Sequence, residues 1–167
     1  FKAGQDEVLA PLIASGAITV VHEDWAEDWK PENAKKITAA AITRGAPFIG
    51  ILASNDGTAS GAIQALIEER LSGIIVTGQD AELAACQRIA SGSQAMTIYK
   101  PLKTLASGAA ELAVGLARRE VVVATGKIDN GKRTVPACFY PVVTVTRDNL
   151  DATVVADGFH TSAEVWR

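Results

Sequence analysis

The chain has 167 residues, of which 48% are hydrophobic and 21% are charged, enough for one or two compact units with a buried core. Its formal net charge is -3, and acidic and basic residues are interspersed, so the basic surface typical of nucleic-acid-binding proteins is missing. The longest apolar runs, such as residues 48–53, are far shorter than the roughly 20 residues of a membrane-spanning helix. We therefore predict a globular protein that binds no nucleic acid and does not insert into a membrane.

The first hundred residues alternate between helical and strand patterns. Helical spacing of apolar residues and β-branched runs distinguish the two. Helices are predicted over residues 4–14, 32–43, 57–70 and 81–90, and strands over residues 17–22, 48–53, 74–77 and 95–99. Short apolar strands that alternate with amphipathic helices predict an α/β fold, an open parallel sheet flanked by helices on both faces.

The pattern changes after residue 99. A longer helix is predicted over residues 102–119, where apolar residues recur at helical spacing. The Asn130-Gly131 pair predicts a turn, and the prolines of the following β-rich stretch favour an edge or crossover strand over a central one. The tail over residues 156–167 is predicted to be irregular or briefly helical.

Polar or aromatic clusters follow the predicted strands. The first strand is followed by EDWAEDW, and the next three by SND, TGQD and YKP. Ligands of open parallel sheets bind beyond the carboxyl ends of the strands. We therefore expect one cleft to be lined by Asn55, Asp80, Lys100 and the pair Trp25 and Trp29.

This set of side chains favours a neutral ligand that is rich in hydroxyl groups. Amide, carboxylate and ammonium groups together supply the donors and acceptors that hydroxyls need. An indole face offers a flat apolar surface for the C–H side of a pyranose. The stretch SNDGTASGAIQAL looks like a phosphate cradle, but Asp56 and Asp80 would repel a phosphate and no glycine-rich phosphate motif is present.

Each of these residues also has a purely structural interpretation. Asn55, Asp56 and Asp80 precede predicted helices and could cap them. The two tryptophans could pack in the core or an interface, and Lys100 could be a solvated surface lysine. The shared position of the cluster at the strand ends favours function more strongly than any single member does.

Several small residues are given structural roles. Cys86 and Cys138 are too few for a disulfide scaffold and lack metal-ligand spacing, so small buried or half-buried side chains are favoured over a functional thiol pair. Gly61 and Gly108 lie within predicted helices, where they are expected to allow close packing.

No catalytic site can be assembled from this sequence. The only histidines are His22 and His160, and neither lies in a recognisable motif with a nucleophile and a base. We therefore predict a protein that is not an enzyme, with no cofactor and no metal site.

The chain carries, in this order, the stretches FKAGQ, EDWKPENA, SNDGTASGAIQAL, TGQDAEL, MTIYKP and DGFH. Together they resemble the C-terminal half of the periplasmic D-xylose-binding proteins, the soluble components of sugar ABC transporters. The resemblance covers almost the whole chain, and DWKPEN and GQDAEL bring it closer to the xylose branch than to the ribose or galactose binders. It implies two Rossmann-like α/β lobes joined by three hinge strands, with the sugar between the lobes. It also implies a periplasmic or extracellular location, with a lipid anchor upstream as one option.

The resemblance assigns a role to each candidate residue. Trp29 is similar to a stacking tryptophan, Asn55 and Asp80 to hydroxyl-binding groups, and Lys100 to a donor on the hinge side. The residues that support these contacts from behind are Trp25, Asp56 and Gln79.

The resemblance also implies a domain organisation. Residues 1–100 correspond to the C-terminal sugar-binding lobe without its first strand, and residues 101–134 to a hinge crossover with a helix that packs on the absent N-terminal lobe. Residues 135–167 correspond to the return strand and a tail across the hinge. The missing lobe is expected as a second polypeptide, because the helix would otherwise expose an apolar stripe to water.

The predicted function is non-catalytic binding of a monosaccharide, with D-xylose favoured, for delivery to an ABC permease. The alternative is a sugar-sensing subunit that signals to a membrane histidine kinase or a chemoreceptor. The effector lobe of a transcription regulator is a more distant option, because the chain has no helix-turn-helix or basic patch.

Overall fold

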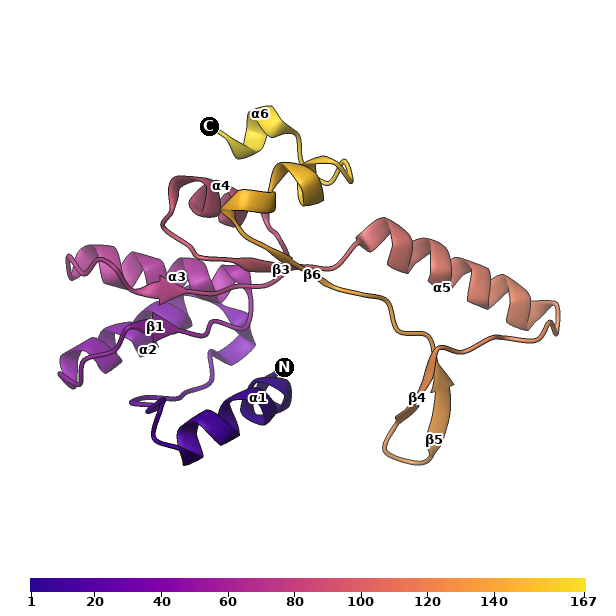
Figure 1. Cartoon of the computed structure of the whole chain (residues 1–167), viewed down its shortest axis with the longest axis horizontal. Coiled ribbons are helices and arrows are strands. Elements are labelled where there is room, and N and C mark those ends of the chain that lie inside the picture. The colour runs from indigo at the N-terminus through magenta and orange to yellow at the C-terminus, as the bar shows by residue number, and fades with distance from the viewer. The chain divides into compact units, whose positions relative to one another are not determined.

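Helices and short strands alternate through most of the chain in the computed structural model, which describes all residues from 1 to 167 (Figure 1). Contacts divide it into two units, residues 1–99 with 144–167 and residues 100–143. The first unit contains the helices α1 (Lys2–Ala14), α2 (Pro31–Thr43), α3 (Asp56–Glu68), α4 (Leu83–Ser91) and α6 (Ser162–Val165). Its strands are β1 (Gly50–Ile51), β2 (Ile75–Val76) and β3 (Thr97–Tyr99), and β6 (Val143–Val145) begins at the unit boundary.

The strands form short ladders in the order β1, β2, β3, β6. β1 and β2 are parallel, with Ile51 opposite Val76. Just beyond β2, Gln79 pairs in parallel with Ile98, and β3 in turn is hydrogen-bonded to β6. The predicted parallel arrangement of the successive strands 48–53, 74–77 and 95–99 is therefore confirmed, although the regular part of each is shorter.

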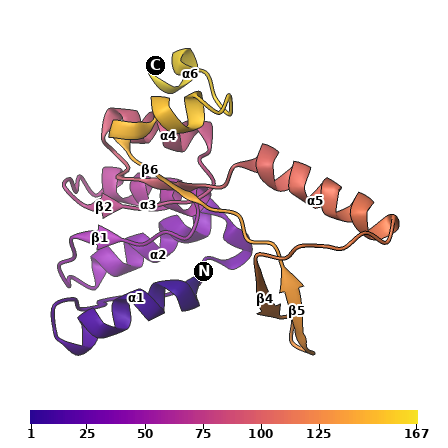
Figure 2. The same ribbon diagram turned by 45° about the vertical axis from the view of Figure 1, so that its right-hand side comes forward.

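Helix α3 supplies much of the core of the first unit. Its residues Ala59, Ile63 and Leu66 pack on Val76 of β2, and partly buried side chains from α2 and β1 surround them. Helices α2 and α3 lie side by side, as both ribbon views show (Figure 2). Their approach is close at Gly61, where an added Cβ atom would lie 1.9 Å from the carbonyl oxygen of Pro31. The predicted packing role of this glycine is confirmed.

The strand predicted over residues 17–22 is not formed. The amides of Ala17 and Ile18 donate to the carbonyl of Leu12 at the end of α1, and no ladder follows them. Val20 and Val21 are 48% and 41% exposed. A β-branched run becomes a strand only where a neighbouring backbone supplies ladder partners, and no strand is paired with this segment.

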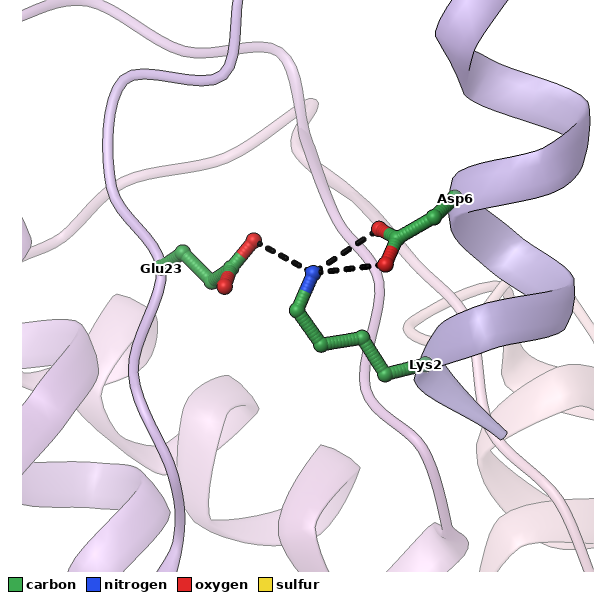
Figure 3. Close-up of polar contacts among 3 residues, drawn as sticks. All are labelled: Lys2, Asp6 and Glu23. Carbon is green, nitrogen blue, oxygen red and sulfur yellow. Dashed lines mark hydrogen bonds and ion pairs between the residues drawn. The ribbon is translucent and has the colours of Figure 1, made fainter.

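An exposed ion cluster connects the start of α1 to the residues that follow this segment. The ammonium group of Lys2 lies 2.8 Å from a carboxylate oxygen of Asp6 and 3.0 Å from one of Glu23 (Figure 3). The carboxylate side chains are 55% and 57% exposed and that of Lys2 is 36% exposed, so solvent screens the attraction and its contribution to stability is small.

The C-terminal tail packs into the first unit. Val145, Leu150, Val154 and Val165 are completely buried, and α6 contacts α4. Between β6 and α6 lie two short helical turns, Arg147–Asn149 and Asp151–Val155. The short helix α6 confirms the prediction that the tail is irregular or briefly helical.

The second unit consists of helix α5 (Leu102–Ala117) and the antiparallel hairpin of β4 (Gly126–Asp129) and β5 (Thr134–Ala137). The predicted turn is present, with Gly131 at a φ of +83° and the Asn130 side chain accepting from the amides of Lys132 and Arg133. Gly108 of α5 lies against Tyr140, so its predicted packing role is also confirmed. The assignment of these residues to a hinge crossover stays a prediction.

Candidate functional site

The chain segments that follow β1 and β2 are joined at their carboxyl ends. The amide of Asp56 donates to the carbonyl of Gln79 at 2.8 Å. The side-chain amide of Gln79 reaches back to the carbonyl of Ser54 at 3.4 Å. Asn55 and Asp80, each next to one of these bonded residues, therefore lie on neighbouring strand ends, as predicted from the sheet.

Asn55 is the N-cap of α3. Its Oδ1 accepts from the backbone amide of Thr58 at 2.8 Å and from the Thr58 hydroxyl at 2.6 Å. The backbone amide of Asn55 in turn donates to the Thr58 hydroxyl at 3.3 Å, which completes a capping box. The prediction that Asn55 could cap a helix is therefore confirmed, and its side-chain oxygen is the capping atom. The Nδ2 amide has no partner, so two donor hydrogens remain available to a ligand.

Asp56 is completely buried and does not cap the helix. Its carboxylate accepts from Nε2 of Gln94 at 2.8 Å, from the hydroxyl of Thr97 at 2.9 Å and from the amide of Glu82 at 3.0 Å. Burial raises the pKa of the Asp56 carboxyl above its usual range, against the effect of these hydrogen bonds. Asp56 therefore connects the start of α3 to the loop after β2 and to β3.

The loop after β2 has an unusual backbone. Asp80 has a φ of +101° and Ala81 a φ of +52°, in the region that residues other than glycine rarely adopt. The amide of Asp80 donates to the carbonyl of Ile98 at 2.8 Å, and the amide of Ala81 donates to the hydroxyl of Thr97 at 3.1 Å. Helix α4 begins later, with Glu82 at its N-cap, so capping does not explain Asp80. Backbone strain of this kind is concentrated at functional sites.

Both candidate tryptophans lie outside the core. Trp25 is 74% exposed and Trp29 is 50% exposed, which excludes core packing as their role within this chain. The ring of Trp29 meets that of Phe1 edge to face, with centroids 5.8 Å apart. Trp29 lies two residues before Pro31, which is near the start of α3, since a Cβ atom on Gly57 would be in ordinary van der Waals contact with its side chain at 3.7 Å. A half-exposed indole thus lies in the chain segment next to the cap of α3.

Lys100 follows β3 directly and is partly buried. It is the first residue of the 100–143 unit, so the cluster within the first unit consists of Asn55, Asp56, Gln79 and Asp80. The residue before it, Tyr99, is buried, and its hydroxyl donates to the carboxylate of Asp157. Burial, together with this carboxylate, raises the pKa of Tyr99 to about 12, so the phenol remains a donor at neutral pH.

Several residues that hold the cluster together were not predicted. Gln94 and Thr97 bind Asp56, and Nε2 of His160 lies 2.7 Å from the carbonyl oxygen of Ala81. Polar residues within an otherwise apolar strand, as in AMTIY, were the available signal for Thr97. The stretch DGFH contains His160, but nothing local in the sequence indicated its contact with Ala81, which lies 79 residues away.

The remaining reactive groups form no second site. Cys86 is buried, Cys138 is partly buried, and both are free. Burial raises the pKa of the Cys86 thiol to about 11, which makes it a poor nucleophile. No group of three or more histidine, cysteine, aspartate or glutamate residues is arranged to hold a metal ion. None of the helices combines the length and apolar character needed to span a membrane.

An α/β unit with polar side chains at the carboxyl ends of parallel strands belongs to the class of folds that bind small ligands at that edge. Within this class, the chain matches the family described as periplasmic binding protein domain over residues 1–120, and it belongs to that family.

Known relatives agree with this assignment. The chain is 46% identical to the D-xylose-binding periplasmic protein of Haemophilus influenzae and, equally, to that of Escherichia coli, over 99% of its length and 51% of theirs. It therefore spans about half the length of these relatives. The predicted resemblance to periplasmic D-xylose-binding proteins is confirmed.

Solved structures of sugar-binding proteins share the fold. A carbohydrate transporter solute-binding protein from Chloroflexus aurantiacus, in complex with D-glucose, is 33% identical with a TM-score of 0.83, over 94% of this chain and 54% of that one. An ABC transporter solute-binding protein from Clostridium phytofermentans, with bound β-D-glucose, is 28% identical with a TM-score of 0.83, over 98% of this chain and 54% of that one. The predicted α/β fold class is confirmed.

Proposed function

We propose that this chain is part of a periplasmic protein that binds a monosaccharide without catalysis and delivers it to an ABC permease, with D-xylose as the favoured sugar. The observation that carries the proposal is the 46% identity to two D-xylose-binding periplasmic proteins over 99% of the chain. The glucose bound by two structural neighbours supports a sugar ligand but also makes glucose the main competitor of xylose.

The proposed contacts follow from the chemistry of four side chains, of which Trp29 is exposed and Asn55, Asp80 and Lys100 are partly buried. Asp80 accepts hydrogen bonds from sugar hydroxyls, and the free Nδ2 amide of Asn55 donates to sugar oxygens. Trp29 stacks its indole on the apolar face of the ring, and Lys100 adds a donor. Trp25, Asp56 and Gln79 act behind these contacts, and for Asp56 and Gln79 the bonds described above support that role.

Titration calorimetry with D-xylose, and with D-glucose and D-ribose as controls, tests the proposal on protein whose chain content has been established by intact mass. Asp80→Asn is the informative variant, because asparagine tolerates a positive φ and keeps the size of the side chain, while it removes the charge and replaces one acceptor oxygen by an amide donor. We expect it to weaken xylose binding by about 1.5–3 kcal/mol, the value of a hydrogen bond to a charged group. Glu82→Gln removes a neighbouring exposed charge and is expected to leave the affinity unchanged. Equal affinities for wild type and Asp80→Asn would refute the site.

We propose further that a second lobe, as a separate polypeptide, covers part of the 100–143 unit. Leu102, Val114 and Leu116 of α5 are 53%, 48% and 65% exposed, which leaves an apolar surface in water. A ligand held between two lobes would favour their closed arrangement, and a permease could recognise that closed form. Copurification of a second polypeptide with the chain, detected by intact mass, is the expected result; a stable monomer of this chain alone contradicts it.

A further inference from the structure

We propose that the tail segment Asp157–His160 positions Asp80 for sugar binding, with His160 as a positioning residue that acts through the carbonyl of Ala81. One consequence of this inference, that the tail helps to determine sugar affinity, rests on the proposed function. Its geometric part concerns the backbone of residues 80–82 and can be measured without any sugar.

His160 holds the carbonyl of the residue that follows Asp80. Its Nε2 lies 2.7 Å from the oxygen of Ala81, which is completely buried. A carbonyl oxygen can only accept, so this ring nitrogen carries the hydrogen. The thiol of Cys86 also approaches the same oxygen, at 3.6 Å, but a thiol is a weak donor and does not replace an imidazole N–H.

The peptide group between Ala81 and Glu82 is therefore held at both ends. His160 binds its carbonyl, and the buried carboxylate of Asp56 accepts from its N–H. In the preceding peptide group, the amide of Ala81 donates to the hydroxyl of Thr97. A left-handed backbone at two consecutive residues persists only where its surroundings fix it. Of the three side chains that bind this backbone, only His160 lies in the C-terminal tail.

The tail segment is itself anchored at the end of β3. The ring of His160 packs on Phe159 with centroids 4.5 Å apart, and Phe159 packs on Tyr99 at 5.0 Å. The hydroxyl of Tyr99 donates to Asp157. The segment thus connects the end of β3, just before Lys100, to the loop that presents Asp80.

Two variants of nearly equal size and polarity test the role of the Nε2 donor. Glutamine at position 160 places an amide nitrogen near the position of histidine Nε2, whereas asparagine places one near Nδ1 and does not reach the Ala81 carbonyl. We expect His160→Gln to retain wild-type xylose affinity within about twofold, and His160→Asn to weaken it roughly 3- to 10-fold, the range for one lost neutral hydrogen bond.

A second tail contact serves as the control for loss of stability. The side chain of Gln87 donates to the carbonyl of Glu164 at 2.9 Å and attaches the same tail to α4 without touching Ala81. Gln87→Met is expected to lower the melting temperature about as much as His160→Asn does, with xylose affinity unchanged. An equal loss of affinity in Gln87→Met would overturn the proposal, because the tail would then act only through stability.

Amide hydrogen exchange of residues 80–82 without sugar separates this inference from the proposed function. Faster exchange at Glu82 in His160→Asn, and not in His160→Gln or Gln87→Met, is the expected result. Unchanged exchange in His160→Asn overturns the positioning role, whatever the sugar affinities are. Changed exchange in a protein that binds none of the tested sugars refutes the proposed function alone.

Discussion

Asp56 shows how one buried carboxylate organises the candidate site. Both of its oxygens accept hydrogen bonds, one from Gln94 and the other from Thr97 and the amide of Glu82. An asparagine in its place would direct an amide donor toward one of these donors and leave it unpaired. We expect Asp56→Asn to lower the free energy of unfolding by about 1–3 kcal/mol, although it removes a buried charge.

The pH dependence of this effect has a defined sign. The carboxyl ionises near its ordinary pKa of 3.8 in the unfolded chain and at higher pH in the folded protein. Between these values the unfolded state has lost a proton that the folded state retains, so stability falls as the pH rises. The free energy of unfolding of wild type minus that of Asp56→Asn should therefore decrease from about pH 3.8 upward and then level off, as measured by urea denaturation. A difference that grows with pH would contradict this assignment.

Gly78 is required by the same cluster. A Cβ atom at this position would lie 2.0 Å from Oδ1 of Asp56 and 2.5 Å from Nε2 of Gln94, and so would break the bond between them. We expect Gly78→Ala to destabilise the protein by about 2–4 kcal/mol, from overpacking and the lost hydrogen bond together. Gly4→Ala, in helix α1 with nothing within 4 Å, is the matched control and should not destabilise it.

The sequence pattern predicted that Asn55 and Asp56 lie at a strand end, but it could not distinguish their roles. Asn55 and Asp56 are adjacent and both precede a helix, yet the first is a partly exposed cap and the second is completely buried. The difference depends on Gln94 and Thr97, which lie 38 and 41 residues further along the chain. Local pattern carries no information about such distant partners.

At the level of elements, the contact between α2 and α3 sets the position of the segment that carries Trp29. A Cβ atom on Gly61 would lie 1.9 Å from the carbonyl oxygen of Pro31 and 3.0 Å from the amide of Lys35, both backbone atoms that cannot rotate away. We expect Gly61→Ala to force the helices apart and to lower the free energy of unfolding by about 3 kcal/mol in urea denaturation. Gly115→Ala in α5 meets nothing closer than a flexible glutamate oxygen at 3.5 Å and should be neutral or stabilising.

Helices were predicted more accurately than strands, for a physical reason. The helix predicted over residues 102–119 spans residues 102–117, and the one predicted over 4–14 spans residues 2–14, because helical hydrogen bonds are local and apolar spacing reports them. The strand predicted over residues 17–22 fails because a strand needs a neighbouring backbone, which its own composition does not specify.

At the level of the whole molecule, the two units differ in how much they bury. Helix α3 buries eight of its 13 residues, whereas α5 buries only Gly108 among its 16. Segments with little buried apolar surface open at a low free energy, well below that of global unfolding. The second unit is therefore expected to open locally while the first remains folded.

Limited proteolysis with trypsin can compare the units at two similar residues. Arg119 follows α5 and Arg70 follows α3; both are exposed, with φ values of +59° and +55°. Since cleavage tracks the population of the locally open state, we expect the bond after Arg119 to be cut well before the bond after Arg70, with fragments identified by mass. A second lobe that covers α5 should slow only the first cut. Equal rates at both arginines would mean that the two units open together as one cooperative body.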